Sequence, residues 1–421
     1  MTQTGFRYFM VLLVAAAVLA GCGTAITRSA TGRHAHTTPS TSTRSARVTT
    51  PRPSSERVVT ADLPEFHTVH MITPQTGWVR TTTFNTSGVV TGSALWRTTD
   101  GARTWRRVFH GAGPFLTWAA PTAARAWVVT HTHADGRHLE VWTTVDGGAH
   151  WHVRTLLAPW SGPDLSASLV IAANGTGSLV AGVLGNEMQT GPQALWLITD
   201  DTVAANPVYT STNTQFIQAS WATPTVGWMI ASSALIDDTA AVLFQSTDGG
   251  RQWTAVPLPV PASFPSAAND HPQDIPFLSL NAPPTFITPT DGYLLASVTD
   301  GPVQGPLITS PVLYQTTNDE TWTPVWVGAP NQSLAQLQWV DPQHAWAILS
   351  SNNDAQETLA TSATGGRSWV SASAPPDAAT RPTEDLMALS PTAAVMYAVG
   401  QDNHLQVYHT TDGGKTWEAG R

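Results

Sequence analysis

The chain has 421 residues, of which 42% are hydrophobic and only 12% are charged, so it can bury a large core and is not a largely disordered polymer. Its charge is uneven: residues 1–57 hold seven arginines and one acid, whereas the remainder holds 13 basic and 28 acidic residues, a net charge of −15. Such an acidic domain offers no broad basic stripe for phosphates, and we expect no nucleic-acid partner.

The first residues are predicted to be a secretion signal. Arg7 precedes an apolar run at 8–21, which is short for a membrane span and has the anatomy of a signal peptide. The run ends in LAGC, and Cys22 is the only cysteine of the chain, which excludes disulfides and cysteine-based metal sites. LAGC resembles the lipobox of bacterial lipoproteins. The resemblance implies lipidation of Cys22 and anchorage on the extracytoplasmic side of a cell-envelope membrane; the alternative is an ordinary signal peptide with an incidental cysteine.

Residues 22–60 are predicted to form a lipid-anchored disordered linker. They consist mainly of Ser, Thr, Arg, Pro and Ala and have almost no large apolar side chains, so burial cannot offset the entropy of ordering them. The expected organisation is therefore a signal peptide at 1–21, this linker, and a folded domain at 61–421. The basic linker suits anionic lipid headgroups, with the acidic domain held away from them.

The folded domain repeats a phrase with an aspartate, glycines and a tryptophan. It reads LWRTTDGARTW at 95–105, VWTTVDGGAHW at 141–151, LFQSTDGGRQW at 243–253 and VYHTTDGGKTW at 407–417. A second, looser phrase consists of an apolar run, a turn on Pro, Thr, Asp or Gly, and another apolar run. The looser phrase occurs at 69–81, 116–130, 219–231, 284–296, 337–349 and 386–400, with a weaker copy at 168–182.

Each repeat predicts four antiparallel strands. Pro and Gly interrupt every helical period, and short apolar runs joined by tight turns favour strands. The phrase tryptophans Trp105 and Trp151 lie 46 residues apart, and Trp322, Trp369 and Trp417 follow one another at 47 and 48 residues. Four-stranded units of this period are typical of β-propeller blades. The count predicts an all-β, seven-bladed β-propeller of four-stranded antiparallel blades, preceded by the signal peptide and linker.

Three copies of the tryptophan phrase are irregular. The third blade has lost it at 195–208, the fifth has a shortened form at 314–322, and the sixth has Thr364 where aspartate is expected.

The phrase Ser/Thr-x-Asp-Gly-Gly-x-Thr-Trp resembles the Asp-box, or BNR, repeat of sialidase-like propellers. Together with the P-x-x-G-W phrase it resembles the photosystem II assembly-factor-like propellers of bacteria, over residues 62–421. That resemblance implies a role in assembling or stabilising membrane-associated complexes. The photosynthetic relatives use an arginine-rich surface, and the acidic domain of this chain departs from that pattern.

We predict structural roles for the box residues. The aspartate accepts hydrogen bonds from backbone amides of its turn, the glycines adopt positive φ, and the tryptophan is buried against the neighbouring sheet. These roles fall to Asp100, Gly101, Trp105, Asp146, Gly147, Trp151, Asp248, Gly249, Trp253, Asp412, Gly413 and Trp417.

A ligand is expected on the face opposite the boxes. In a four-stranded blade the boxes share one face with the first-to-second turns, and the other face carries the second-to-third loops and the blade connections. Side-chain function in propellers usually collects on that second face, an analogy at the level of fold. The segments 257–284 and 298–311 are long for such connections. They predict a binding lip with Asp270, His271 and Asp274 as candidate residues; the alternative is a pliable proline-rich insertion.

We expect the domain to be a non-catalytic scaffold that binds a protein or glycan partner on this face, without a cofactor. The Arg-Ile-Pro phrase and recurring inner-strand arginines of sialidases are absent from the sequence. The alternative is a cell-wall sugar binder or a carbohydrate-active enzyme, sialidase-like or xyloglucanase-like, with two facing carboxylates. The loop acids that could supply such a pair are Asp237, Asp238, Asp270, Asp274, Asp291, Asp354 and Glu357.

Two further points stay open in the sequence. His131 and His133 alternate on one strand near His150 and His152, a spacing compatible with zinc or copper. The alternative is a polar hairpin tip, and we assign no metal. Residues 57–63 could also complete the last blade as a clasp that closes the ring.

Overall fold

The computed structural model describes residues 58–60 and 66–419, apart from gaps at 112, 132–136, 161–164, 173, 184–191, 212–213, 234–241, 265–276, 281, 301–307, 352–356, 374, 376–382 and 400–404. These residues belong to one compact unit, Arg47–Arg421. The described part of the chain contains strands and no helix, and so no helix there could cross a membrane. The predicted signal peptide, Cys22 and most of the linker lie outside the described residues.

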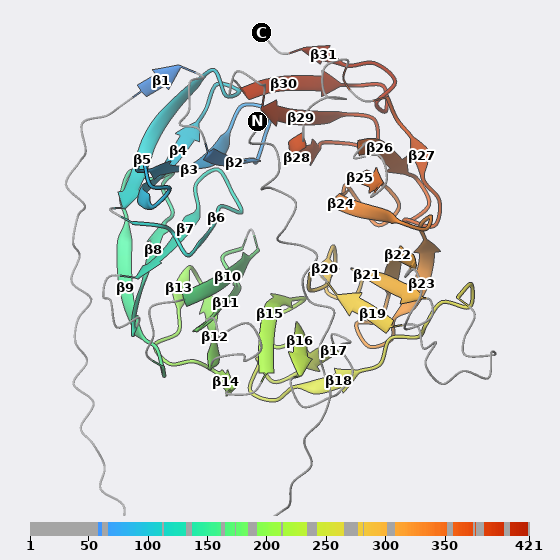
Figure 1. Ribbon diagram of the computed structural model, residues 1–421, viewed down its shortest axis with the longest axis horizontal. Coiled ribbons are helices and arrows are strands. Elements are labelled where there is room, and N and C mark those ends of the chain that lie inside the picture. Colours follow the sequence, from blue (N-terminus) through green and yellow to red (C-terminus); the bar gives the residue numbers. More distant parts are fainter. Residues whose placement is uncertain are drawn as a thin grey trace, which may run out of the picture. The chain divides into compact units, whose positions relative to one another are not determined.

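Seven antiparallel sheets follow one another in chain order around a ring (Figure 1). The prediction of a seven-bladed β-propeller is thereby confirmed. Blades 1 to 3 consist of β2 (Phe66–Met71), β3 (Gly77–Phe84), β4 (Val90–Thr98) and β5 (Thr104–Gly111); β6 (Thr117–Ala119), β7 (Ala126–His131), β8 (His138–Thr144) and β9 (His152–Leu157); and β10 (Leu165–Ile171), β11 (Gly177–Val183), β12 (Gln193–Thr199), β13 (Thr202–Val203) and β14 (Tyr209–Ser211).

Blades 4 to 7 repeat this order from inner to outer strand. They consist of β15 (Thr214–Trp221), β16 (Gly227–Ser233), β17 (Val242–Ser246) and β18 (Thr254–Val256); β19 (Phe277–Leu280), β20 (Thr285–Phe286), β21 (Gly292–Asp300), β22 (Ile308–Thr316) and β23 (Thr323–Val327); β24 (Gln332–Trp339), β25 (Ala345–Ser351), β26 (Glu357–Ser362) and β27 (Val370–Ser371); and β28 (Thr383–Ala388), β29 (Ala394–Val399), β30 (Leu405–Thr410) and β31 (Glu418–Ala419).

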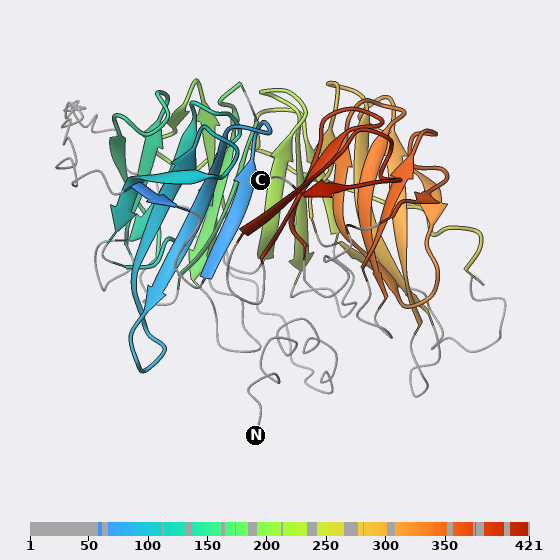
Figure 2. The same ribbon diagram turned by 90° about the horizontal axis from the view of Figure 1, so that it is seen from above.

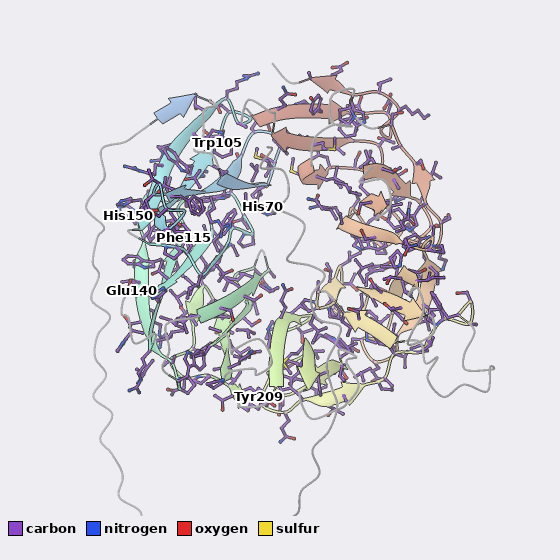
Figure 3. The ribbon with its side chains drawn as sticks, viewed as in Figure 1. His70, Trp105, Phe115, Glu140, His150 and Tyr209 are labelled. Atoms are coloured by element: carbon purple, nitrogen blue, oxygen red, sulfur yellow. The ribbon has the colours of Figure 1, made fainter. Side chains whose placement is uncertain are left out.

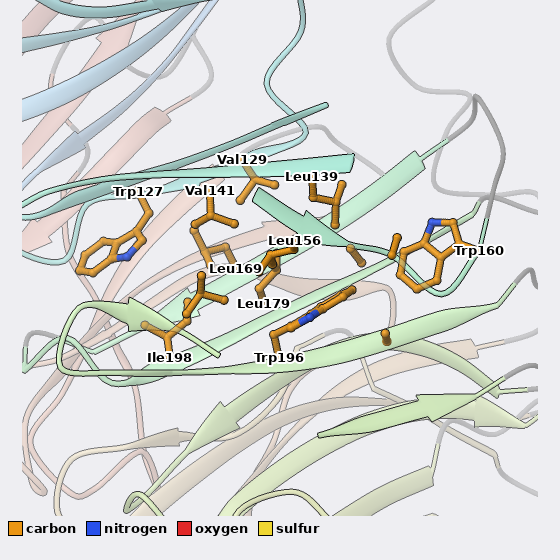
Figure 4. Close-up of a cluster of buried hydrophobic side chains, with 14 residues drawn as sticks. Trp127, Val129, Leu139, Val141, Leu156, Trp160, Leu169, Leu179, Trp196 and Ile198 are labelled. Atoms are coloured by element: carbon orange, nitrogen blue, oxygen red, sulfur yellow. The ribbon is translucent and has the colours of Figure 1, made fainter. Parts of the chain in front are cut away.

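Seven apolar clusters of the described residues each join two neighbouring blades. At the seam of blades 2 and 3, Trp127 and Val129 pack with Leu179 and Trp196 (Figure 4). Equivalent clusters occupy the other six seams. A second strand is therefore covered on both faces, which explains why it reads as a continuous apolar run instead of an alternating one. Most of the core lies between sheets, so each blade depends on its two neighbours.

The ring closes by side-chain packing and not by strand exchange. Trp105 of blade 1 packs with Met387 and Tyr397 of blade 7. Blade 7 obtains its outer strand, β31, from its own C-terminal end. The N-terminal strand β1 (Val58–Thr60) instead lines the outer edge of blade 1, pairing with β5. The alternative that residues 57–63 complete the last blade is therefore wrong, because every blade is built from a continuous stretch of chain.

Candidate functional site

Each of the four intact aspartate–glycine–tryptophan phrases forms a turn built around one aspartate, which we call the box turn. In blade 7, Oδ1 of Asp412 accepts hydrogen bonds from the backbone N–H groups of Lys415 (2.9 Å) and Thr416 (3.0 Å), and Oδ2 accepts one from the Thr416 hydroxyl (2.6 Å). The Thr410 hydroxyl donates to Oδ1 at 2.9 Å and accepts from the N–H of Gly414 at 3.1 Å. Closely similar turns surround Asp100, Asp146 and Asp248.

These hydrogen bonds favour the ionised form of the box carboxylates. The side chain and backbone of Thr416 donate to Asp412 and lower its pKa. At Asp146 partial burial raises the pKa, but hydrogen bonds from His150 and Thr144 outweigh it and bring the pKa to about 2. A general acid needs a pKa near the working pH. The box aspartates instead have lowered pKa values and stay ionised at neutral pH. An ionised carboxylate is suited to accept hydrogen bonds in a turn.

A backbone hydrogen bond ties the third-to-fourth turn of every blade, which is the box turn in all but blade 3, to the first-to-second turn of the same blade. In blade 1 the N–H of Gly101 donates to the carbonyl of Gln75 at 2.9 Å, and in blade 7 the N–H of Gly413 donates to that of Thr392 at 2.8 Å. The other five pairs are Gly147–Ala124, Asp201–Gly175, Gly249–Thr225, Asp319–Thr290 and Gly365–Gln343. The two repeated phrases therefore meet on one face, which we call the box face; the opposite face is the loop face.

The box turns also press on the preceding blade. A Cβ added to Gly148 of blade 2 would lie 2.6 Å from the Cβ of Val108 in blade 1, so a side chain at this position would clash with Val108. The indole N–H of Trp151 donates to the carbonyl of Val108 at 2.9 Å, and that of Trp417 donates to the carbonyl of Ser373 at 2.7 Å. In these blades the box is thus both packed and hydrogen-bonded across the seam.

The aromatic residue of the looser phrase makes the matching contact with the following blade. The indole N–H of Trp78 in blade 1 donates to the carbonyl of Thr122 in blade 2 at 3.1 Å, and that of Trp346 in blade 6 donates to the carbonyl of Ser390 in blade 7 at 3.0 Å. The hydroxyl of Tyr293 does the same from blade 5 to blade 6. Both phrases therefore contribute hydrogen bonds between blades.

Blades 5 and 6 keep the turn with other side chains. Oδ1 of Asn318 takes the place of the aspartate and accepts from the N–H of Thr321 at 2.9 Å. In blade 6, Oγ1 of Thr364 accepts from the N–H of Ser368 at 2.9 Å. A negative charge is therefore not required at this position, which only needs an acceptor oxygen.

Blade 3 replaces the box by a two-residue hairpin. Its central residues Asp200 and Asp201 have φ of 49° and 59°, the left-handed values that such a turn requires and that aspartate tolerates. The Nε–H of Arg125 in blade 2 lies 3.0 Å from both carboxylate oxygens of Asp201. Trp160, which follows β9, packs edge-on against Trp196 at this seam. An ion pair and a different tryptophan thus hold a seam that lacks a box.

The predicted binding residues Asp270, His271 and Asp274 lie outside the described residues. Among the other loop acids, Asp291 belongs to the first-to-second turn of blade 5 on the box face, where the Thr288 hydroxyl donates to it at 2.7 Å. It therefore lies on the box face and not on the loop face. The side chains of Asp237, Asp238, Asp354 and Glu357 lie outside the described part of the structure.

The histidines near blade 2 separate into two groups. His131 ends β7 and is followed by the second-to-third connection, whereas His150 and His152 lie beside the box turn at the opposite end of the blade. Nδ1 of His150, at the outer side of the ring (Figure 3), lies 2.7 Å from Oδ2 of Asp146. The residues that the structure describes contain no group of three His, Cys, Asp or Glu side chains that could hold a metal ion.

Blade 1 carries a surface feature that the sequence analysis missed. Its hairpin of β3 and β4 extends past the strand ends of the neighbouring blades on the loop face (Figure 2). Phe84 and Val89 at the tip are 43% and 59% exposed. The signal was present in the sequence, because residues 81–96 form a run without any charged side chain.

Comparisons with known proteins reach the fold and no further. No protein-family model matches this chain, and no curated protein matches its sequence significantly. The solved structures that it resembles include an ulvan lyase of polysaccharide lyase family 25, at 12% identity with a TM-score of 0.48, over 71% of this chain and 80% of that one. The β-propeller domain of the trilobed protease from Pyrococcus furiosus is 8% identical, with a TM-score of 0.46 and coverage of 85% and 96%. An oligogalacturonate lyase from Vibrio parahaemolyticus is 9% identical, with a TM-score of 0.45 and coverage of 85% and 98%.

These neighbours correct one expectation. The sequence led us to expect a protein that is not an enzyme, and that prediction is wrong as stated, because two of the three propellers are lyases. At 8 to 12% identity the likeness concerns the fold alone, and no reaction is transferred from it. What the chain shares with these structures is the β-propeller.

Proposed function

We propose that this chain is an extracytoplasmic, lipid-anchored β-propeller that binds a protein or glycan partner through its loop face. Cys22 would carry the lipid and the basic linker would tether the propeller to the envelope membrane. The resemblance of the repeats to assembly-factor-like propellers suggests that the partner belongs to a membrane-associated complex.

The observation that carries this proposal is that many polar groups of the box face are already engaged in hydrogen bonds within the propeller. The third-to-fourth turn of every blade, six of them box turns and one the hairpin of blade 3, donates to the first-to-second turn of its own blade. The box tryptophans of blades 2 and 7 also donate to the preceding blade. The turns on this face are short and internally bonded, which leaves little to recognise a partner. The long connections of the chain leave from the other face, and binding residues in proteins are disproportionately found on loops held by a rigid scaffold.

The longest of these connections has a fixed base. It runs from β18 to β19, between Val256 and Phe277. The hydroxyl of Tyr314 donates to the carbonyl of Pro259 at 2.8 Å, and Phe264 is 9% exposed within the cluster between blades 4 and 5. This base supports the proposal that the following segment, with Asp270, His271 and Asp274, presents side chains to a partner.

The test is photo-crosslinking and capture of the full-length, lipidated protein from its native membranes. We expect a specific crosslinked partner with the wild-type chain and its loss, at an unchanged melting temperature, when Asp270, His271 and Asp274 are replaced by alanine. The matched control is Val145→Ser on the box face, where Val145 is 49% exposed; it should capture as well as wild type. Equal capture by the loop variant and the control would contradict the proposal.

Anchorage is tested separately with Cys22→Ala. This variant should leave the membrane fraction, and retention of it in washed membranes would reject the lipid anchor.

A further inference from the structure

The basic residues of the propeller are concentrated in its first two blades. Residues 66–160, which form blades 1 and 2, hold eight arginines and four acids; residues 161–421 hold five basic and 22 acidic residues. The net charges are +4 and −17. The ring is therefore electrically lopsided, although its total charge is strongly negative. We call residues 66–160 the basic sector.

Several of these arginines belong to the outer strands and turns of their blades. Arg106 and Arg107 lie on β5, Arg154 lies on β9, and the exposed Arg103 occupies the box turn before β5. The outer strands form the circumference of the ring (Figure 1). Part of the positive charge thus lies on the outer strands, at the rim of the ring, although the guanidinium of Arg107 packs over the Trp96 ring with its Nε buried.

The chain enters the propeller at this same rim. Strand β1 is the outermost strand of blade 1 and pairs with β5, with Val58 opposite Arg106. Cys22 and Val58 are separated by 35 residues, six of them arginine, and a flexible linker of that length has a root-mean-square span of about 30 Å. An anchored chain therefore holds its basic sector, rather than the acidic blades, nearest to the membrane.

The projecting hairpin of blade 1 adds an apolar tip beside the basic sector. Oδ1 of Asn85 accepts from the N–H groups of Ser87 and Val89, both at 2.9 Å, and the N–H of Asn85 donates to the carbonyl of Val89 at 2.9 Å. Gly88 supplies the positive φ of 77° that this turn needs. The tip is therefore a preformed turn that presents Phe84 and Val89 among hydroxyl and amide groups without any charge.

We infer that blades 1 and 2 dock on an anionic lipid bilayer, with Phe84 and Val89 of the hairpin tip entering its interface. Anionic headgroups attract arginines within a Debye length of the surface, and an exposed aromatic or aliphatic side chain gains free energy by leaving water for the acyl boundary. The 22 acids of blades 3 to 7 are repelled by the same surface, which orients the ring. The inference rests on the membrane anchorage in the proposed function and adds the orientation.

The chain is suited to a direct test, because Cys22 is its only cysteine. An environment-sensitive fluorophore is attached through maleimide to Thr86→Cys at the tip, or to Val145→Cys on the box face as the control position. The full-length, lipidated protein is reconstituted into vesicles of phosphatidylcholine alone or with phosphatidylglycerol, and a spin-labelled lipid serves as quencher. The tip label should be quenched several-fold more than the control label in anionic vesicles, and the difference should shrink in about 0.5 M NaCl.

Charge orientation is tested with a matched pair of variants. Arg137 is exposed on the loop face, just before β8, whereas Arg103 is exposed in the box turn of blade 1 on the opposite face. In the tip-labelled chain, Arg137→Glu should reduce quenching in anionic vesicles several-fold, and Arg103→Glu should reduce it less. Replacing Phe84 and Val89 by serine should also abolish the blue shift of the tip label. Both side chains are exposed, so the melting temperature should be kept.

The outcomes separate the inference from the anchorage on which it rests. Maleimide labelling of the wild-type chain would show that Cys22 is a free thiol, and would reject the anchor. With the anchor intact, equal quenching of the tip and control labels, or quenching independent of lipid charge, would overturn the docking. Quenching in native membranes and not in protein-free vesicles would also overturn it, because the tip would then meet a membrane protein.

Discussion

The indole N–H of Trp151 donates a hydrogen bond to the carbonyl oxygen of Val108 at 2.9 Å, across the seam between blades 2 and 1. Trp417 and Ser373 repeat this relationship at 2.7 Å between blades 7 and 6. The donor lies 43 and 44 residues beyond the acceptor in the two cases, close to the repeat length. The period of the sequence is therefore also the period of the bonds that hold neighbouring sheets together.

Replacing Trp151 separates its packing from its hydrogen bond. Trp151→Phe keeps an aromatic ring beside Phe109 but leaves the Val108 carbonyl without this donor, which should cost about 1 kcal/mol. Trp151→Ala also removes a side chain that is only 3% exposed and should cost about 3–5 kcal/mol. Urea unfolding monitored by far-UV circular dichroism measures both. An alanine variant no less stable than the phenylalanine variant would contradict the assignment of Trp151 to the core of the seam.

The Asp146 turn should weaken in acid. Its pKa in the folded chain is about 2, below the value of about 3.9 in an unfolded chain. The ionised carboxylate therefore stabilises the fold above about pH 4, and this contribution is lost as the pH falls towards 2. Because Asn318 closes the equivalent turn of blade 5, Asp146→Asn should keep an acceptor oxygen but lose the contribution of the charge. Its stability at pH 7 should lie between that of wild type and that of Asp146→Ala, which should lose at least about 1 kcal/mol.

Unfolding midpoints at about pH 5, above both pKa values, and at about pH 3, between them, check this dependence. The stability difference between wild type and Asp146→Ala should narrow at the lower pH. A difference that is the same at both pH values would show that the carboxylate charge contributes nothing to the turn.

The sequence repeat made the seven-bladed architecture predictable. Contacts between turns and the closure of the ring could not be predicted from it. Period, turn residues and strand length indicated seven blades, because each phrase has a local reason to fold as it does. The bond between Gly101 and Gln75 was not predictable, since it joins two turns whose distance depends on the packed blade. Ring closure stayed open in the sequence for the same reason: residues 57–63 could pair with either edge, and the structure pairs β1 with β5 of blade 1.

The ion pair between Arg125 and Asp201 should couple blades 2 and 3. Both groups are partly exposed, at 35% and 19% for their side chains, so a double-mutant cycle of Arg125→Met and Asp201→Asn should give a coupling of about 0.5–1 kcal/mol. Salt should reduce it, because screening weakens partly exposed pairs. The control cycle uses Asp200→Asn, the neighbouring position of the same turn, and should give no coupling. Equal coupling in both cycles would exclude a specific pair.

The features of the candidate site also divide into those that the sequence predicted and those that it did not. The box residues were recognised from sequence because each acts within its own turn, as the contacts of Asp412 with Thr416 illustrate. The basic sector was not recognised because only the net charge of the whole folded domain, −15, was considered. That total does not reveal the excess of arginine in blades 1 and 2. The projecting tip was missed because residues 84–90 read as an ordinary hairpin loop, and its exposure depends on how far the neighbouring blades extend.

The most direct test of how the propeller is held together compares two adjacent glycines. Gly413 and Gly414 have nearly equal φ, 79° and 78°, but a Cβ at Gly413 would meet open space, whereas one at Gly414 would lie 2.7 Å from the Cβ of Ala372 in blade 6. Both alanine variants bear the backbone cost of a left-handed residue, about 1–2 kcal/mol, and only Gly414→Ala adds a clash across the seam. Thermal and urea unfolding should therefore show a clearly larger loss of stability for Gly414→Ala. Equal losses in the two variants would contradict the claim that the box turn of one blade is wedged against the blade before it.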